Sequence, residues 1–224
     1  PVPSPDSTPA PTPAPLLPPL AIGEGLYSIF VKDAKPEAYW RLDEIQGSFP
    51  FGPVDCVGDN DGLYSGDVVT NVPPGAVNDG NPAITLDGQS GFAAIPFRTL
   101  LNQPSFTVEA WVLIASGVPF EGRQPIVSSL NSLASAGLSG GAGFVLAVGF
   151  SGGNTIDFQI TVFARNLQDG TQPSVTLTAP APEGILLSDY NYVVASIDGQ
   201  EQVLRLYING KLEAALDLLN HPLG

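Results

Sequence analysis

The residues of this chain that are capable of nucleophilic catalysis stand in the wrong context for it. Residues 149–153, Gly-Phe-Ser-Gly-Gly, match the G-x-S-x-G pattern of a nucleophilic serine. That pattern needs a strand before the serine and a helix after it. Residues 155–160 instead predict a strand, so 151–154 predict a glycine-rich hairpin turn. His221 is the only histidine and lies near the C-terminal end, so we expect no serine hydrolase.

Acid–base catalysis by paired carboxylates is also poorly supported. Glycosidases hold two carboxylates about 5–9 Å apart across the scissile bond. Asp43 and Glu44 are adjacent, so on a strand they would point to opposite faces. Glu109 stands alone on its expected strand. Carboxylates brought together from separate loops would still allow a glucanase, but we expect no enzyme.

A glycine-rich loop carries four residues whose oxygens suit a hard cation. Asp55, Asp59, Asn60 and Asp61 lie within seven residues, and Ca²⁺ prefers several carboxylate and amide oxygens as ligands. The spacing is not that of an EF-hand, because no glutamate follows at position 12. The alternative is that these residues only form turns, which Asp, Asn and Gly favour. The loop therefore predicts either a structural calcium site or a series of turns.

The aromatic residues suggest both core and ligand contacts. Trp40 and Trp111 lie among apolar residues of expected strands, so we expect both in the core. Tyr64, Tyr190 and Tyr192 lie near loops rich in Asp and Asn. An exposed aromatic ring beside such polar side chains is a typical ligand contact. These three tyrosines are the candidate ligand-binding residues, and ordinary packing is the alternative for each.

These candidates would be positioned by many short strands. Twenty-five glycines and 23 prolines among 224 residues indicate frequent turns and little helix. Residues 106–114 alternate between apolar residues and a second set that includes Thr107, Glu109 and Trp111, which is a period of two. The pairs Asp87-Gly88 and Asn209-Gly210 predict hairpin turns. The expected strands are 26–31, 38–42, 83–86, 92–95, 106–114, 143–150, 155–163, 174–178, 192–197, 203–208 and 212–216. Short helical turns are expected near 98–102 and 129–136, so the fold class is an all-β antiparallel sandwich or barrel.

The N-terminal segment and the overall charge restrict the partners. Residues 1–19 contain nine prolines and predict an extended polyproline II arm, either a spacer or a strap that docks on a partner subunit. The remaining domain is expected to span 25–224, with 1–24 as arm or linker. Eight Lys and Arg against 22 Asp and Glu give a net charge of −14. This acidic balance argues against nucleic acid, and no apolar stretch is long enough for a membrane span.

Five segments in order resemble the laminin-G-like, concanavalin A-like jelly-roll modules. They are Ala-Tyr-Trp-Arg-Leu-Asp-Glu at 38–44, the Asp/Gly/Asn loop at 55–62, the hairpin formed by 84–88 with 92–96, Ser-Phe-Thr-Val-Glu-Ala-Trp-Val at 105–112, and the late hairpin formed by 193–198 with 204–211. The resemblance covers about residues 25–217. It departs from the family at 188–192, where Ser-Asp-Tyr-Asn-Tyr stands in place of a frequent Trp-His pair. Family members also usually continue past the late hairpin with a further strand. We therefore expect that the domain is truncated, that its last strands lie in residues outside this sequence, or that another chain supplies the open sheet edge.

The resemblance implies a β-sandwich that often binds a structural calcium. It also implies a non-catalytic adhesion or recognition module for glycan or a surface receptor, lectin-like and carried on a secreted, cell-surface or virion protein. The alternative is a structural subunit of an extracellular filament or virion. Identical subunits would then assemble through residues 1–19 and an open sheet edge.

Overall fold

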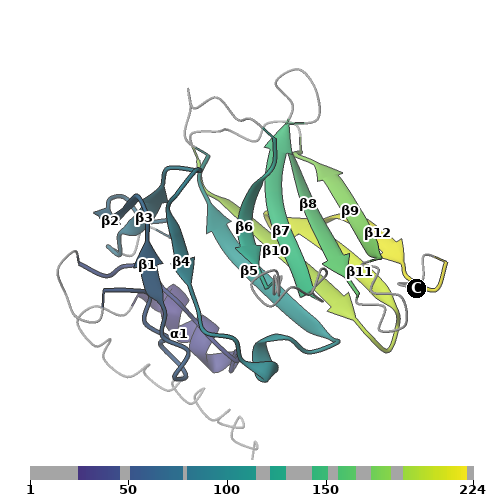
Figure 1. The fold of residues 1–224 in the computed structure, drawn as a ribbon, viewed down its shortest axis with the longest axis horizontal. Coiled ribbons are helices and arrows are strands. Elements are labelled where there is room, and N and C mark those ends of the chain that lie inside the picture. The colour runs from purple at the N-terminus through teal and green to yellow at the C-terminus, as the bar shows by residue number, and fades with distance from the viewer. Residues whose placement is uncertain are drawn as a thin grey trace, which may run out of the picture.

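A computed structural model describes residues 25–45, 51–77, 80–114, 122–129, 143–150, 156–164, 173–182 and 189–220. Strands dominate it (Figure 1). In chain order the elements are α1 (Leu26–Asp33), β1 (Leu63–Ser65), β2 (Val68–Val72), β3 (Ala83–Leu86), β4 (Phe92–Ala94), the 3₁₀ turn η1 (Thr99–Leu101), β5 (Phe106–Val112), β6 (Gln124–Ser128), β7 (Gly143–Phe150), β8 (Ile156–Phe163), β9 (Ser174–Pro180), β10 (Asn191–Asp198), β11 (Val203–Ile208) and β12 (Lys211–Asp217).

Two four-stranded antiparallel sheets form the sandwich. One has the order β12-β11-β10-β5 and the other β6-β7-β8-β9, and Figure 1 shows the second lying in front of the first. Alternate residues of each strand point between the sheets. Phe106 of β5 stacks on Phe144 of β7, with ring centroids 4.5 Å apart. The fully buried core side chains include Leu146, Phe158, Ile160, Val193, Leu204 and Leu206. The expected all-β sandwich is confirmed.

A long irregular ribbon replaces the hairpin expected at Asp87-Gly88. Strand β3 pairs with β2, and β4 pairs with β1, so 63–72 and 83–94 run antiparallel along each other. Asp87 does not close a tight turn, because its Oδ1 accepts hydrogen bonds from the N–H groups of Gln89, Ser90 and Gly91. This carboxylate organises a bulge, after which the chain continues in the same direction. The prediction of a hairpin between 83–86 and 92–95 was wrong.

Glycine is required at the bulge because the two chains approach closely there. A Cβ at Gly66 would lie 2.0 Å from the carbonyl oxygen of Ser90, and one at Gly91 would lie 2.1 Å from the carbonyl oxygen of Asp67. Gly66 also has a positive φ of 69°, which side chains disfavour. The ribbon can therefore keep both pairs of strands in register only with these two glycines.

The segment before the ribbon differs most from expectation. Residues 26–31, expected as a strand, begin the helix α1, and the expected strand 38–42 contains only the single bridge between Trp40 and Asp55. A short apolar run without alternation is ambiguous between helix and strand. Here Ser28 is buried while Leu26 and Phe30, four residues apart, are exposed. That spacing is helical.

The second half of the chain follows the expected strands, apart from β6, which was not expected. The expected strands from 106 onward correspond to β5 and β7–β12, and the turn expected near 98–102 is η1. Most of the turn expected at 129–136, the arm at 1–24, Ser151 and His221 lie outside the described residues. In the part of the chain that is described, no helix is long and apolar enough to cross a membrane.

Candidate functional site

An aromatic cluster lies on the outer face of the β12-β11-β10-β5 sheet. The alternation of β5 turns Phe106, Val108 and Val112 toward the core and Thr107, Glu109 and Trp111 away from it. In the register of the sheet Trp111 lies opposite Tyr192 of β10. Their rings are 4.9 Å apart between centroids and inclined by 33°. Cross-strand pairing therefore creates a two-ring surface on this face.

The helix α1 adds a third ring. Tyr27 meets Trp111 edge to face, with centroids 6.0 Å apart and an interplanar angle of 75°. In Figure 1 α1 lies behind β1 and β4, on the side of the molecule away from the viewer. Trp111 remains 37% exposed, so the expectation that it belongs to the core was wrong. Trp40 is half-buried, and its Nε1–H donates to the carbonyl oxygen of Asn60 at 2.8 Å.

A carboxylate completes this group. The Tyr192 hydroxyl donates a hydrogen bond to Oε2 of Glu109, which lies one pleat away from Trp111 on the same face. Burial raises the pKa of Tyr192 above its ordinary value, and the hydrogen bond to Glu109 raises it further. Burial also raises the pKa of Tyr27, and the charge of Glu109 adds to the effect. We call Tyr27, Trp111, Tyr192 and Glu109 the aromatic platform.

Among the described positions of β5 and β10 that surround the platform, Glu109 is the one carboxylate. Along β5, the residues that share a face with Glu109 are Thr107 and Trp111. Across the sheet, Val194 lies opposite Glu109, and Tyr192 and Ser196 occupy the diagonal positions. None of these is acidic, so the strand positions around Glu109 provide no acid–base pair.

The other two candidate tyrosines lie elsewhere. Tyr64 is only 9% exposed, packs against Phe51 with ring centroids 5.4 Å apart and donates its hydroxyl hydrogen to Glu44 at 2.5 Å. Tyr190 donates to the carbonyl oxygen of Pro74 at 3.2 Å. Burial raises the pKa of both tyrosines. Of the three, Tyr192 is the one that lies in the aromatic platform.

The loop proposed for calcium is held by its own hydrogen bonds. Oδ1 of Asp55 accepts from the N–H groups of Tyr39 at 2.9 Å and Val57 at 3.1 Å. Oδ2 accepts from the backbone N–H of Asn60 at 3.2 Å and from its side-chain amide at 2.7 Å. Burial alone would raise the pKa of Asp55, but these donors outweigh it and lower the pKa. The Asp55 carboxylate therefore holds the loop in its conformation through these four hydrogen bonds.

Some of the oxygens proposed for calcium are used within the loop. Asp61 uses Oδ1 to accept the N–H of Asp55 at 2.8 Å, and Asp59 is exposed. Two of the three carboxylates, those of Asp55 and Asp61, therefore already accept backbone N–H groups. Across the described residues, no three His, Cys, Asp or Glu side chains gather as a metal site would require. This geometry favours the turn-forming role.

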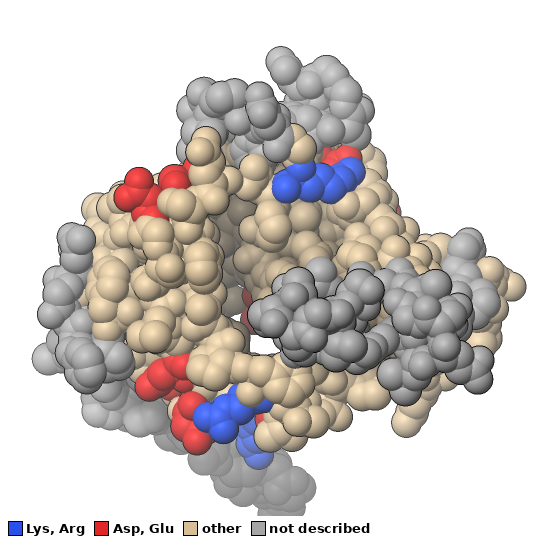
Figure 2. Space-filling model, in the orientation of Figure 1, with Lys and Arg blue, Asp and Glu red and all other residues tan. Residues whose placement is uncertain are grey.

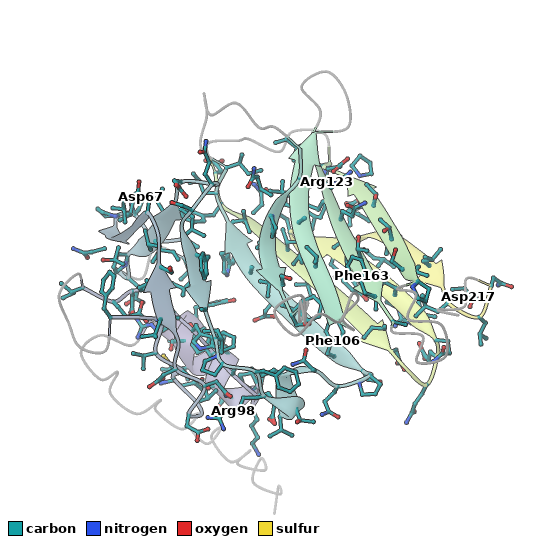
Figure 3. The ribbon with its side chains drawn as sticks, viewed as in Figure 1. Asp67, Arg98, Phe106, Arg123, Phe163 and Asp217 are labelled. Carbon is teal, nitrogen blue, oxygen red and sulfur yellow. The ribbon has the colours of Figure 1, made fainter. Side chains whose placement is uncertain are left out.

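A pocket of about 300 Å³ lies beside that loop. Its lining includes Glu37, Asp59, Asn60, Arg98 and Leu100, and Arg98 makes a long hydrogen bond of 3.4 Å to the carbonyl oxygen of Asp59. Figure 3 labels Arg98 at the lower end of the molecule, and Figure 2 shows acidic and basic side chains together there. Since Glu37, Asp59 and Arg98 are exposed and no aromatic ring lines the pocket, it offers weaker anchoring than the platform.

An ion pair between an exposed arginine and a buried aspartate lies near the upper end of the second sheet, where Figure 3 labels Arg123. Arg123 donates to both carboxylate oxygens of Asp157, with 3.1 Å from its second nitrogen to Oδ2. Asp157 is 1% exposed. Because both its oxygens are engaged, this carboxylate is a structural partner rather than a free base.

Sequence reasoning missed three of the four platform residues. Trp111 and Glu109 carried a usable signal, because the alternation of 106–114 already placed them together on the face opposite the core residues. Tyr27 carried none, since its position depends on a helix where a strand was expected.

Comparison with known proteins gives one match. The family described as the concanavalin A-like lectin/glucanases superfamily, in its laminin G form, matches residues 87–223, more than half of the 224-residue chain. That range includes β5 and β10 and therefore Glu109, Trp111 and Tyr192. No curated protein and no solved structure matches the chain.

Proposed function

Because the chain belongs to the concanavalin A-like lectin/glucanase superfamily, we propose that it is a non-catalytic recognition module that binds glycan. The observation that carries this proposal is the aromatic platform, with Trp111 37% exposed between two tyrosine rings and beside a carboxylate. A surface receptor that presents a glycan would be bound by the same groups.

The chemistry of the platform suits a sugar ring. The apolar C–H face of a pyranose can pack on an exposed indole and gains from the apolar area that it buries. Its hydroxyl groups can donate to the free lone pairs of Glu109, and hydrogen bonds to a charged acceptor are stronger than neutral ones. Together these contacts would fix both the plane and the rotation of the sugar.

The absence of a partner for Glu109 supports binding rather than hydrolysis. Glycosidases of either stereochemistry use two carboxyl groups about 5–9.5 Å apart. The positions around Glu109 on β5 and β10 hold no second acid. The acidic side chain of Asp157 lies on the other sheet and is bound to Arg123. These observations support a lectin-like rather than a glucanase-like role in our proposal.

Tryptophan fluorescence tests the proposal directly. The chain has two tryptophans, so Trp40→Phe leaves Trp111 as the single reporter, and Trp111→Phe leaves Trp40. A screen of neutral oligosaccharides should give a saturable change in emission in Trp40→Phe and none in Trp111→Phe. Trp111→Ala should abolish binding measured by calorimetry while thermal unfolding stays cooperative. Saturable binding that survives Trp111→Ala would show that the platform is not the site.

The acidic, lightly charged composition and the family suggest where such a module works. We propose a secreted, cell-surface or virion protein, on which residues 1–24 serve as an arm or linker. Fractionation of the source cells with an antibody against the sandwich would test this, and a purely cytosolic signal would contradict it.

A second function, a structural subunit of a filament or virion, is favoured by exposed apolar residues on the ribbon. Leu63 and Phe92 share one face of β1–β4 and are 62% and 51% exposed. Apolar exposure of this kind often marks an interface. Light scattering on the full chain and on a chain without residues 1–19 tests the idea. A large assembly that falls to monomer without the arm would support a structural subunit, and monomers in both cases would reject it.

A further inference from the structure

The carboxylate of the aromatic platform has no cationic partner. Glu109 accepts the Tyr192 hydroxyl, and no ion pair of Glu109 occurs within the described residues. The basic residues of the neighbouring strands are used otherwise, since Arg205 pairs with Glu201 at 2.5 Å and Lys211 with Glu213 at 3.0 Å. A ligand on the platform would therefore meet a negative charge that the protein does not neutralise.

The aromatic rings around Glu109 also favour a positively charged ligand. The face of an aromatic ring carries negative quadrupole density, and a cation within about 6 Å of a Trp or Tyr centroid is attracted to it. The ring centroids of Trp111 and Tyr192 lie 4.9 Å apart with the planes inclined by 33°, and the Tyr192 hydroxyl is bonded to Glu109. An ammonium group that binds Glu109 therefore lies beside both aromatic side chains. Tyr27 presents its ring at 75° to the indole and provides a side wall.

The charge of the whole chain adds a long-range contribution. Twenty-two acidic residues stand against eight basic ones, so the average potential attracts cations. On the face shown in Figure 2, basic side chains occupy two small areas near the upper and lower edges. The platform lies on the opposite face, on β5 and β10.

We propose that the platform selects amino sugars whose amine is protonated, with the ammonium group held between the Glu109 carboxylate and the rings of Trp111 and Tyr192. This inference rests on the proposed glycan-binding function and narrows it to a cationic class of glycan. The sugar ring makes the stacking contact, and the ammonium group makes a charged sugar bind more tightly than a neutral one.

Three tetrasaccharides test the inference: a β-1,4-glucosamine tetramer, the N-acetylglucosamine tetramer and cellotetraose. Affinities are measured by calorimetry on the full chain, in slightly acidic buffer that keeps the amines protonated. We expect the glucosamine tetramer to bind about tenfold more tightly than either neutral tetramer. The preference should shrink at high salt, because mobile ions screen charge interactions between exposed groups.

Two variants isolate the role of Glu109. Glu109→Gln keeps the shape and removes the charge, so the ratio of affinities between the charged and neutral tetramers should fall several-fold, to the smaller preference that the rings and the net charge give. Glu37→Gln removes an equal charge from the exposed rim of the pocket beside Arg98, and should leave the ratio unchanged. Thermal unfolding of both variants verifies that the fold is intact.

The outcomes separate the two proposals. If the neutral tetramers bind as tightly as the glucosamine tetramer, the inference is overturned and glycan binding stands. If Glu37→Gln lowers the ratio as much as Glu109→Gln, the selectivity is a property of net charge and the site assignment fails. If no oligosaccharide binds in the broader screen, the proposed function itself is rejected.

Discussion

The Tyr192 hydroxyl donates a hydrogen bond to the Glu109 carboxylate across strands β10 and β5. The bond joins a half-buried phenol to an exposed acid on the outer face of the sheet. Through it, the ionisation of Tyr192 depends on the charge of Glu109. The same contact orients the carboxylate beside the indole of Trp111, so it also defines the geometry that a ligand would meet.

This contact predicts an effect on tyrosine ionisation. Glu109→Gln should lower the pKa of Tyr192, because the neutral amide neither repels the phenolate nor holds the phenolic proton as strongly. Tyr27 should shift in the same direction by less. Absorbance titration of the phenolate band checks this in wild type and variant. Superimposable curves, or an equal shift in Glu37→Gln, would contradict the assigned hydrogen bond.

The hydrogen bonds of Asp55 predict that replacing this one side chain lowers the stability of the folded protein substantially. Asp55→Ala removes the acceptor of four N–H bonds, and unsatisfied donors cost about 1–3 kcal/mol each. Because water can reach some of the freed donors, we expect a total loss of about 3 kcal/mol in the free energy of unfolding. Urea denaturation measures it. Asp59→Ala, at an exposed position of the same loop, should change stability by less than about 0.5 kcal/mol.

The same loop predicts indifference to calcium. Since the oxygens of Asp55 are occupied by donors within the protein and Asp61 caps a backbone N–H, adding millimolar calcium or a chelator should leave the Tm unchanged. Scanning calorimetry with and without each additive is the measurement. A rise of several degrees with calcium that Asp55→Ala removes would refute the turn-forming role.

The hydrogen bonds to Asp87 in the bulge predict that the stability of the fold falls in acid. The N–H groups of Gly91, Gln89 and Ser90 and the Ser90 hydroxyl donate to Asp87, and these bonds lower its pKa. In the unfolded chain an Asp titrates at about pH 4. The hydrogen bonds to Asp87 therefore stabilise the fold fully above that pH, and their contribution is lost as the pH falls through the lower pKa of Asp87 in the folded state.

Asp87→Asn tests this pH dependence. Denaturant unfolding between about pH 5 and pH 2 should give a stability curve that falls less steeply with acid than that of the wild type. Asp67→Asn is the matched control, because Asp67 is exposed in the same bulge and takes part there through its backbone N–H. Parallel curves for the wild type and Asp87→Asn would contradict the role of Asp87.

The ion pair of Arg123 and Asp157 predicts strong coupling between two positions. Arg123→Met leaves the buried Asp157 carboxylate without its partner, and breaking a fully buried pair costs about 3–5 kcal/mol. Because the Arg123 side chain is 36% exposed, we expect a loss at the lower end of that range, about 3 kcal/mol. Arg123→Met combined with Asp157→Leu removes both charges and should recover most of that loss. Urea denaturation of the two single variants and the double variant measures the coupling. Additive losses would mean that the two side chains do not stabilise each other.

The sandwich from β5 onward was predictable except for β6, which was not expected, because the other strands each carry a local signal. Alternation between 106 and 114 and the turn at Asn209-Gly210 determine both the strands and the faces that they bury. The ribbon was not predictable in the same way, since β1 pairs with residues 27–31 positions away and β2 with residues 11–18 positions away, across irregular loops. The short run at 26–31 has no strand period, and packing rather than local pattern decides that it is helical.

The candidate site was likewise predictable only in part. Tyr192 was identified from its neighbourhood of Asp and Asn residues. Trp111 was assigned to the core because tryptophans are usually buried, although the strand pattern already grouped it with Thr107 and Glu109. That local pattern was the better guide, because each strand of a two-sheet sandwich turns alternate residues toward the core and the others outward.

The position of α1 has a consequence for how this protein can be divided. The family match starts at residue 87, in the middle of the ribbon, whereas Tyr27 and both partner strands of β3 and β4 precede it. A graft that began at residue 87 would transfer the sandwich with β4 but without its partner β1. It would also transfer Trp111 without the ring of Tyr27 that packs against it. We therefore expect a transferable fragment to need residues from Gly25 onward, and substitutions in α1 to alter the proposed ligand contact without changing the core of the sandwich.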